Sequence, residues 1–175
     1  MKPSVKFGLY TGLLSGIWVI SCFSMVSWLN NALQLAIPAG RIRAYSGLFS
    51  ILILVLGIYF AAREVKRKNE GQISYGQAVK TGIVVAVITG ILVAFFGFLY
   101  CTVINPGYAA YMVSESEKGM IAAHNSPEQI SLELEKVRQE FSTSSQVMMS
   151  LIGQIVVGSI CSLIVGIFIR NKKQS

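Results

Sequence analysis

Four long apolar blocks, separated by polar segments, dominate the pattern of the chain. Each is long enough for an α-helix to cross a hydrocarbon core of about 30 Å, which takes roughly 20 apolar residues. Apart from Lys80 near the start of the third block, the blocks contain no charged residue. The pattern predicts membrane-spanning helices over about residues 7–28, 44–62, 79–104 and 147–169.

Composition supports a membrane protein. The chain is 53% apolar and only 13% charged, whereas soluble domains average roughly 25% charged residues. The first block is too long for the apolar region of a signal peptide, and no small-residue cleavage site follows it closely, so we expect a retained span. We predict one all-α membrane domain over residues 1–175, an integral four-helix bundle.

The distribution of lysine and arginine predicts the orientation, because positively charged flanks resist translocation. Ten of the 15 basic residues lie before the first block, between the second block and the core of the third, or after the fourth. We therefore expect both termini to face the cytoplasm. The ten are Lys2, Lys6, Arg63, Lys66, Arg67, Lys68, Lys80, Arg170, Lys172 and Lys173, and the other five are Arg41, Arg43, Lys118, Lys136 and Arg138.

The long third loop, residues 105–146, is predicted to face outward and to contain an amphipathic helix. Ser126 and Gln129 form a capping-box pattern, with Pro127 at the first helical position. The segment 142–145 contains no proline or glycine, which allows this helix to run unbroken into span four. Its apolar stripe, a candidate partner surface, consists of Ile130, Leu134, Val137 and Phe141.

Small residues recur every four positions in three of the spans, as they do where helices approach closely in lipid. Two interpretations remain open: the seams pack the four helices of one subunit, or one of them forms a homo-oligomer contact. The glycines concerned are Gly8, Gly12 and Gly16 in span one, Gly82 and Gly90 in span three, and Gly158 and Gly166 in span four.

Gln154, on the same spacing as Gly158, is the only strongly polar side chain within a span. A buried amide in hydrocarbon requires a hydrogen-bond partner, and serine or threonine on a neighbouring span can supply one. We interpret Gln154 as a helix-packing residue; contact with a substrate is the alternative. The candidate partners are Ser21, Ser24, Ser50 and Thr89.

The sequence shows no catalytic, cofactor or metal motif. Cys22, Cys101 and Cys161 are widely spaced and fit small core residues, with a Cys22–Cys101 bridge as an open alternative. His124 is the only histidine, and no further metal-ligating residues accompany it at the spacing of a metal site. The basic residues flank apolar blocks instead of forming a basic face, so we do not expect nucleic-acid binding.

Three short segments resemble a bacterial membrane family catalogued as domain of unknown function 4199. They are Phe7–Gly12, Ser74–Gly82 and Ile104–Pro106, with the helical outer loop before span four completing the resemblance. The resemblance covers nearly the whole chain. It implies a four-span inner-membrane protein of Gram-negative bacteria, with no activity, cofactor or substrate assigned.

Two functional hypotheses follow from these features. The first is a non-enzymatic accessory or scaffold subunit of the bacterial inner membrane, whose outer helix contacts a membrane or periplasmic protein. The second is a small oligomeric transporter or lipid-handling protein, for which Gln154, Thr89 and Ser162 are the only candidates for a polar path. An enzyme is not expected, because no base, nucleophile or metal site is indicated.

Overall fold

The computed structural model describes residues 1–33 and 39–171, and within its helices the side chains of residues 23, 26–33 and 39–44 are not described. The expected end of span one near Trp28 has a helical backbone but an undescribed side chain. Among the basic residues used for orientation, the side chains of Arg41 and Arg43, and the whole of Lys172 and Lys173, lie outside this description.

The chain folds into helices throughout, and the described residues contain no strand, which confirms the all-α prediction. Four helices are long and apolar enough to cross a membrane, at Pro3–Cys22, Tyr45–Lys68, Tyr75–Ile104 and Thr143–Ile169. The elements are α1 (Pro3–Leu33), α2 (Ala39–Lys68), α3 (Tyr75–Leu99), the π-helix η1 (Tyr100–Ile104), α4 (Tyr108–Ala122), α5 (Pro127–Glu140) and α6 (Thr143–Ile169).

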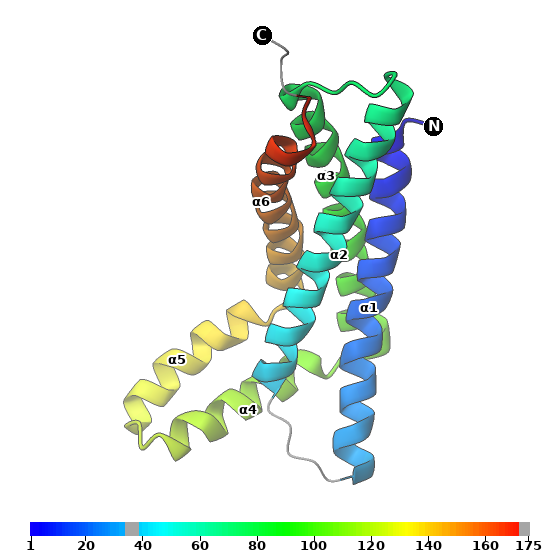
Figure 1. Ribbon diagram of the computed structural model, residues 1–175. Helices are drawn as coiled ribbons and strands as arrows, with labels where there is room; N and C mark the ends of the chain where they lie inside the picture. The colour runs from blue at the N-terminus through cyan, green and yellow to red at the C-terminus, as the bar shows by residue number, and fades with distance from the viewer. Residues whose placement is uncertain (34–38, 172–175) are drawn as a thin grey trace.

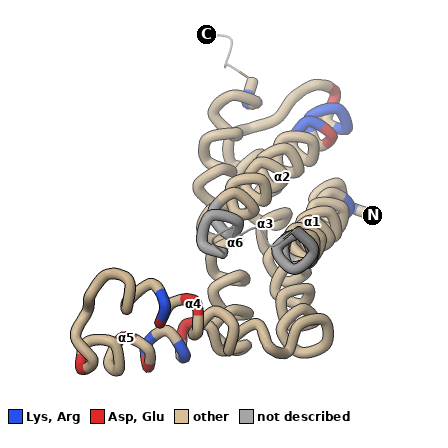
Figure 2. The backbone as a smooth tube through the Cα atoms, turned by 90° about the horizontal axis from the view of Figure 1, so that it is seen from below, with Lys and Arg blue, Asp and Glu red and all other residues tan. Residues whose placement is uncertain are grey.

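The four apolar helices α1, α2, α3 and α6 form an upright bundle (Figure 1). The start of the chain, the end of α6 and the connection between α2 and α3 lie at one end, here named the terminal end. Helices α4 and α5 form a hairpin at the opposite end, the hairpin end, and project to one side of the bundle (Figures 1 and 2). Helix α3 packs most extensively, against α6 and α1 and also against α2.

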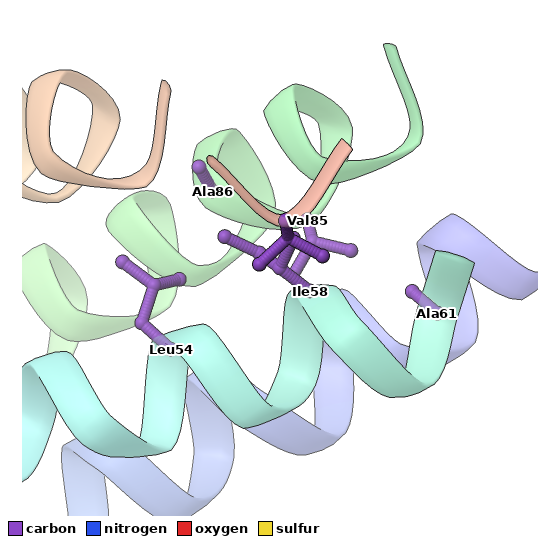
Figure 3. Close-up of a cluster of buried hydrophobic side chains, with 6 residues drawn as sticks. Leu54, Ile58, Ala61, Val85 and Ala86 are labelled. Carbon is purple, nitrogen blue, oxygen red and sulfur yellow. The ribbon is translucent and has the colours of Figure 1, made fainter. Parts of the chain in front are cut away.

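The buried apolar side chains form three clusters along the bundle. The cluster at the terminal end consists of Ala62, Ile73, Ala78 and Ile169. The middle cluster joins α2, α3 and α6 through Leu54, Ile58, Ala61, Val85, Ala86 and Val165 (Figure 3). The cluster at the hairpin end, named the hairpin cluster, consists of Tyr100, Tyr108, Met112 and Phe141.

Hydrogen bonds fasten the terminal end. The Asn171 side-chain oxygen accepts from the Ile73 backbone N–H at 3.0 Å, and its amide nitrogen donates to the Gly71 carbonyl at 3.1 Å. Lys66 Nζ donates to the Ile169 carbonyl at 3.0 Å, where a helix C-terminus favours a positive charge. The end of α6 is thus tied to the connection between α2 and α3.

Two helices begin with a complete capping box, and the one at Ser126 confirms the expected start of the outer helix. Ser74 Oγ accepts from the Gln77 N–H at 3.2 Å before α3, and Ser126 Oγ accepts from the Gln129 N–H at 3.3 Å before α5. In both boxes the glutamine side chain accepts in return from the serine N–H. These reciprocal bonds satisfy amide donors that have no partner within the helix.

The expected continuation of the outer helix into span four is wrong, because α5 ends at Glu140 and α6 begins at Thr143. Ser142 has an extended backbone, with φ −60° and ψ 145°, and its Oγ accepts from the Ser145 N–H at 3.3 Å. A serine cap therefore starts a new helix here without proline or glycine. Gln146 Nε2 also donates to the Glu140 carbonyl at 2.8 Å, across the break.

Candidate functional site

The three predicted glycines of α1 lie against α3. A Cβ added at Gly8 would stand 2.9 Å from Ile88 Cβ, and one at Gly12 would stand 2.6 Å from Leu92 Cδ1. A Cβ at Gly16 would overlap the ring of Phe96. Because real Cβ atoms do not approach so closely, a larger residue would require these α3 side chains, or the helix itself, to shift.

The predicted glycines of α3 and α6 lie mostly between those two helices. A Cβ at Gly82 would overlap Ser162. At Gly90 the nearest atom is the Leu151 carbonyl oxygen, at 3.2 Å, so the backbones themselves approach closely. A Cβ at Gly158 would overlap Ala86, and one at Gly166 would stand 3.1 Å from the Tyr75 ring and Val79.

The three residues expected for a polar path, Gln154, Thr89 and Ser162, do not line one common space. Gln154 Nε2 donates to Ser50 Oγ at 3.3 Å, so α2 supplies one of the expected partners of this amide. Thr89 Oγ1 donates to the Gly8 carbonyl at 3.4 Å, and Ser162 Oγ donates to the Gly158 carbonyl at 2.6 Å. Both hydroxyls are fully buried in helix contacts, and neither lines the cavity beside Gln154.

A partly open cavity of about 300 Å³ lies in the hairpin half of the bundle. Its wall includes residues of α1, α2, α3, η1, α4 and α6. On α6 the lining runs from Gln146 near the helix start to Val157 near its middle. The next turns bring Leu54 against Gly158 in the middle cluster, so packed side chains bound the cavity toward the terminal end.

Glycines that sequence reasoning passed over also line this cavity. A Cβ added at Gly47 or Gly153 would meet nothing within 4 Å, and one at Gly97 would reach only Ser150 Oγ, at 4.0 Å. They differ from the seam glycines because they leave space unfilled. In the sequence these glycines are recognisable only because they do not belong to the four-residue spacing. That fact alone does not tell whether such a glycine lines a cavity or faces lipid.

The predicted stripe on α5 forms part of the hairpin's own core. Phe141 is 7% exposed and packs beside Tyr108, with ring centroids 6.2 Å apart. Val137 packs against the same hairpin cluster, while Ile130 and Leu134 are half-buried. The Phe141 end of the stripe is therefore covered within the chain and does not form an open surface.

The hairpin's exposed surface combines apolar and charged side chains. Ile121 on α4 is 58% exposed and Leu132 on α5 is 65% exposed. Glu115 accepts from Lys118 at 2.9 Å, and this hydrogen bond raises the pKa of Lys118 above its ordinary value. Six glutamates and three basic residues give the segment between spans three and four a net negative charge.

The cysteines and the histidine considered in the sequence do not come together in a catalytic or metal-binding site. The three cysteines are free thiols, so Cys22 and Cys101 are not bridged in this structure. His124 has a positive φ of 59° in the exposed turn between α4 and α5. Within residues 1–33 and 39–171, no group of three or more His, Cys, Asp or Glu side chains is placed to hold a metal ion.

A family described as protein of unknown function (DUF4199) matches residues 6–171 of the chain. The chain belongs to this family. The match confirms the resemblance carried by the three short segments, and with the four apolar helices it indicates a membrane protein. No curated protein and no solved structure matched the chain.

Proposed function

We propose that this DUF4199 member is a non-enzymatic accessory protein of the bacterial inner membrane that presents its α4–α5 hairpin to a protein partner. The observation that supports the proposal best is the hairpin itself. It is a folded element outside the four apolar helices, it projects from the bundle (Figure 1), and the hairpin cluster holds it in place.

The orientation proposed is with both termini in the cytoplasm and the hairpin outside. The described basic residues at the start of the chain, at the end of α2 and directly after α6 lie at the terminal end (Figure 1). Lys66, Arg67 and Lys68 occupy the last turn of α2. Positive charge at that end opposes its translocation and suits anionic headgroups at the cytoplasmic surface.

The exposed chemistry of the hairpin favours a protein partner over the lipid surface. Its net negative charge would be repelled by anionic lipid headgroups. Ile121 and Leu132 offer apolar contacts amid these charges, a pattern suited to a partner with a basic rim around an apolar patch. The non-enzymatic part of the proposal is supported by the sequence, which offers no nucleophile paired with a base.

The test is affinity purification from native membranes in nanodiscs, with mass spectrometry of co-purifying proteins and determination of the particle mass. The variant Ile121→Glu/Leu132→Glu changes two exposed side chains, so the hairpin should still fold. We expect it to lose at least tenfold of the recovered partner. Polar substitution of Val137 would be a poorer test, because it would disturb the hairpin cluster.

The charge control is Gln72→Glu, an exposed change at the terminal end. It should retain the partner. Equal recovery from both variants, or a particle that contains only copies of this chain, would contradict the proposal. The latter result would favour the alternative, a small oligomeric transporter or lipid-handling protein.

A further inference from the structure

Two rows of polar side chains line the cavity in the hairpin half of the bundle. Ser46 and Ser50 are one helical turn apart on α2, and Gln146, Ser150 and Gln154 follow at the same spacing on α6. Residues four apart share one face of a helix. Both rows therefore line the same space, in helices that are otherwise apolar at this level.

These rows have unused hydrogen-bonding capacity. Gln154 donates to Ser50, but its side-chain oxygen makes no hydrogen bond with any residue that the structure describes. The hydroxyls of Ser46 and Ser150 likewise make none within that part of the chain, although Ser46 is only 2% exposed. Polar groups at membrane depth are costly without a partner, so the cavity suits a molecule that supplies oxygen or hydroxyl groups.

The rest of the wall restricts the class of ligand. Among the described residues that line the cavity there is no Asp, Glu, Lys or Arg, so a charged headgroup would find no counter-ion among them. Val19, Val93, Met149 and Val157 provide apolar wall for hydrocarbon. A volume of about 300 Å³ is at the lower end of the range for small-molecule sites, which is too small for a two-chain phospholipid.

We propose that this cavity binds an uncharged single-chain amphiphile of the monoacylglycerol class. Its hydroxyl and ester oxygens lie against the polar rows of α2 and α6, and part of its chain lies against the valine and methionine side chains. The proposal is independent of the hairpin's protein partner, because the hairpin's exposed residues Ile121 and Leu132 do not line the cavity.

The direct test titrates 1-monomyristoylglycerol into the purified protein in nanodiscs of phosphatidylethanolamine and phosphatidylglycerol. Binding is measured by native mass spectrometry and by the shift in unfolding temperature. We expect a one-to-one adduct and a raised unfolding temperature, because a ligand that binds only the folded state stabilises it. Tetradecane, which has no oxygen, and tetradecanoate, which is charged, should each bind at least tenfold more weakly.

Gly97→Leu should fill the cavity and abolish the adduct, since Gly97 lines the cavity and a Cβ added there meets only Ser150 Oγ, at 4.0 Å. Gly119→Leu is the matched control, because Gly119 also has open space around it but lies on α4 outside the cavity. The control should bind as the wild type does.

Gln154→Leu tests the polar row separately and keeps the side-chain volume similar. It should weaken 1-monomyristoylglycerol at least tenfold and leave tetradecane unchanged. The proposal is overturned if no adduct forms, if tetradecane binds the wild type as tightly as the monoglyceride does, or if Gln154→Leu leaves the affinity unaltered. Should Gly97→Leu fail to fold, the Gln154→Leu comparison decides the question.

Discussion

Gly158 and Gly153 lie on the same helix but have different surroundings. A Cβ at Gly158 would overlap Ala86 and stand 3.3 Å from Leu54 Cδ2, whereas one at Gly153 would meet nothing within 4 Å. Overpacking a tight contact costs typically 1–3 kcal/mol, because neighbouring side chains or backbones must shift. Glycine in an open helix position instead costs conformational entropy that alanine avoids.

We therefore expect Gly158→Ala to lower the unfolding free energy by about 1–3 kcal/mol. Gly153→Ala on the same helix should leave it unchanged or raise it by roughly 0.5–1 kcal/mol. Reversible unfolding in mixed micelles, followed by helical circular dichroism, measures both values. Similar losses in the two variants would show that the packing contrast between these positions is wrong.

The four-residue spacing led to Gly158 and the other seam glycines, because spacing on one helix is visible in a sequence. The cavity glycines Gly47 and Gly97 could not be found this way. Whether a glycine meets a neighbour depends on how two helices are rotated about their axes, and that rotation is set by contacts along their whole length. The presence of a glycine in the sequence is therefore compatible both with a tight helix contact and with an empty space beside it.

Ser142 lies between α5 and α6, at the junction of the hairpin and the bundle. Residues 142–145 contain neither proline nor glycine, the usual helix breakers. The cap at Ser142 acts differently, because its side chain satisfies the Ser145 N–H and thereby stabilises a new helix start. Serine is among the preferred residues at that position, so the signal was present but ambiguous.

Replacing this cap should change the angle of the hairpin. Ser142→Ala removes the hydrogen bond to Ser145, at a cost of about 1 kcal/mol, and favours a continuous helix from α5 into α6. Spin labels at Ala123 in the hairpin turn and at Gln72 at the terminal end report the distance between these two sites by pulsed electron paramagnetic resonance. We expect a shifted or broadened distance distribution in the variant.

Ser126→Ala is the matched control for this experiment. It removes the equivalent cap at the start of α5, far from the junction with the bundle. The loss of local helix stability should be similar, with an unchanged distance distribution. A Ser142→Ala distribution identical to that of the wild type would mean that the hairpin cluster alone fixes the angle.

At the scale of the whole molecule, the four spans were predictable because apolar length is a one-dimensional signal. The position of α3 against α1, α2 and α6 was not, since a helix that is apolar over most of its length carries no continuous polar face to mark its exposed side. The cavity was unpredictable for the same reason. Its polar residues Ser46 and Gln146 belong to different helices and become one site only through the packing of the bundle.

The proposed orientation can be checked by cysteine labelling. In a chain whose three native cysteines are replaced by alanine, we expect a membrane-impermeant maleimide to label Ala123→Cys in spheroplasts. Gln72→Cys at the terminal end should be labelled only after the membrane is broken. The reverse pattern would place the termini outside, and the hairpin would then meet cytoplasmic partners.

The hydrogen bonds of Asn171 and Lys66 hold the helices together at the terminal end, so the two ends of the bundle differ. On the terminal side of the cavity, the middle cluster and these hydrogen bonds resist separation of the helices, while the cavity itself leaves the hairpin half less completely filled. For the amphiphile proposed above, such a bundle would be a receptacle that is closed toward the terminal end. A guest would leave by the route through which it entered, so occupancy would follow its supply on one face of the membrane.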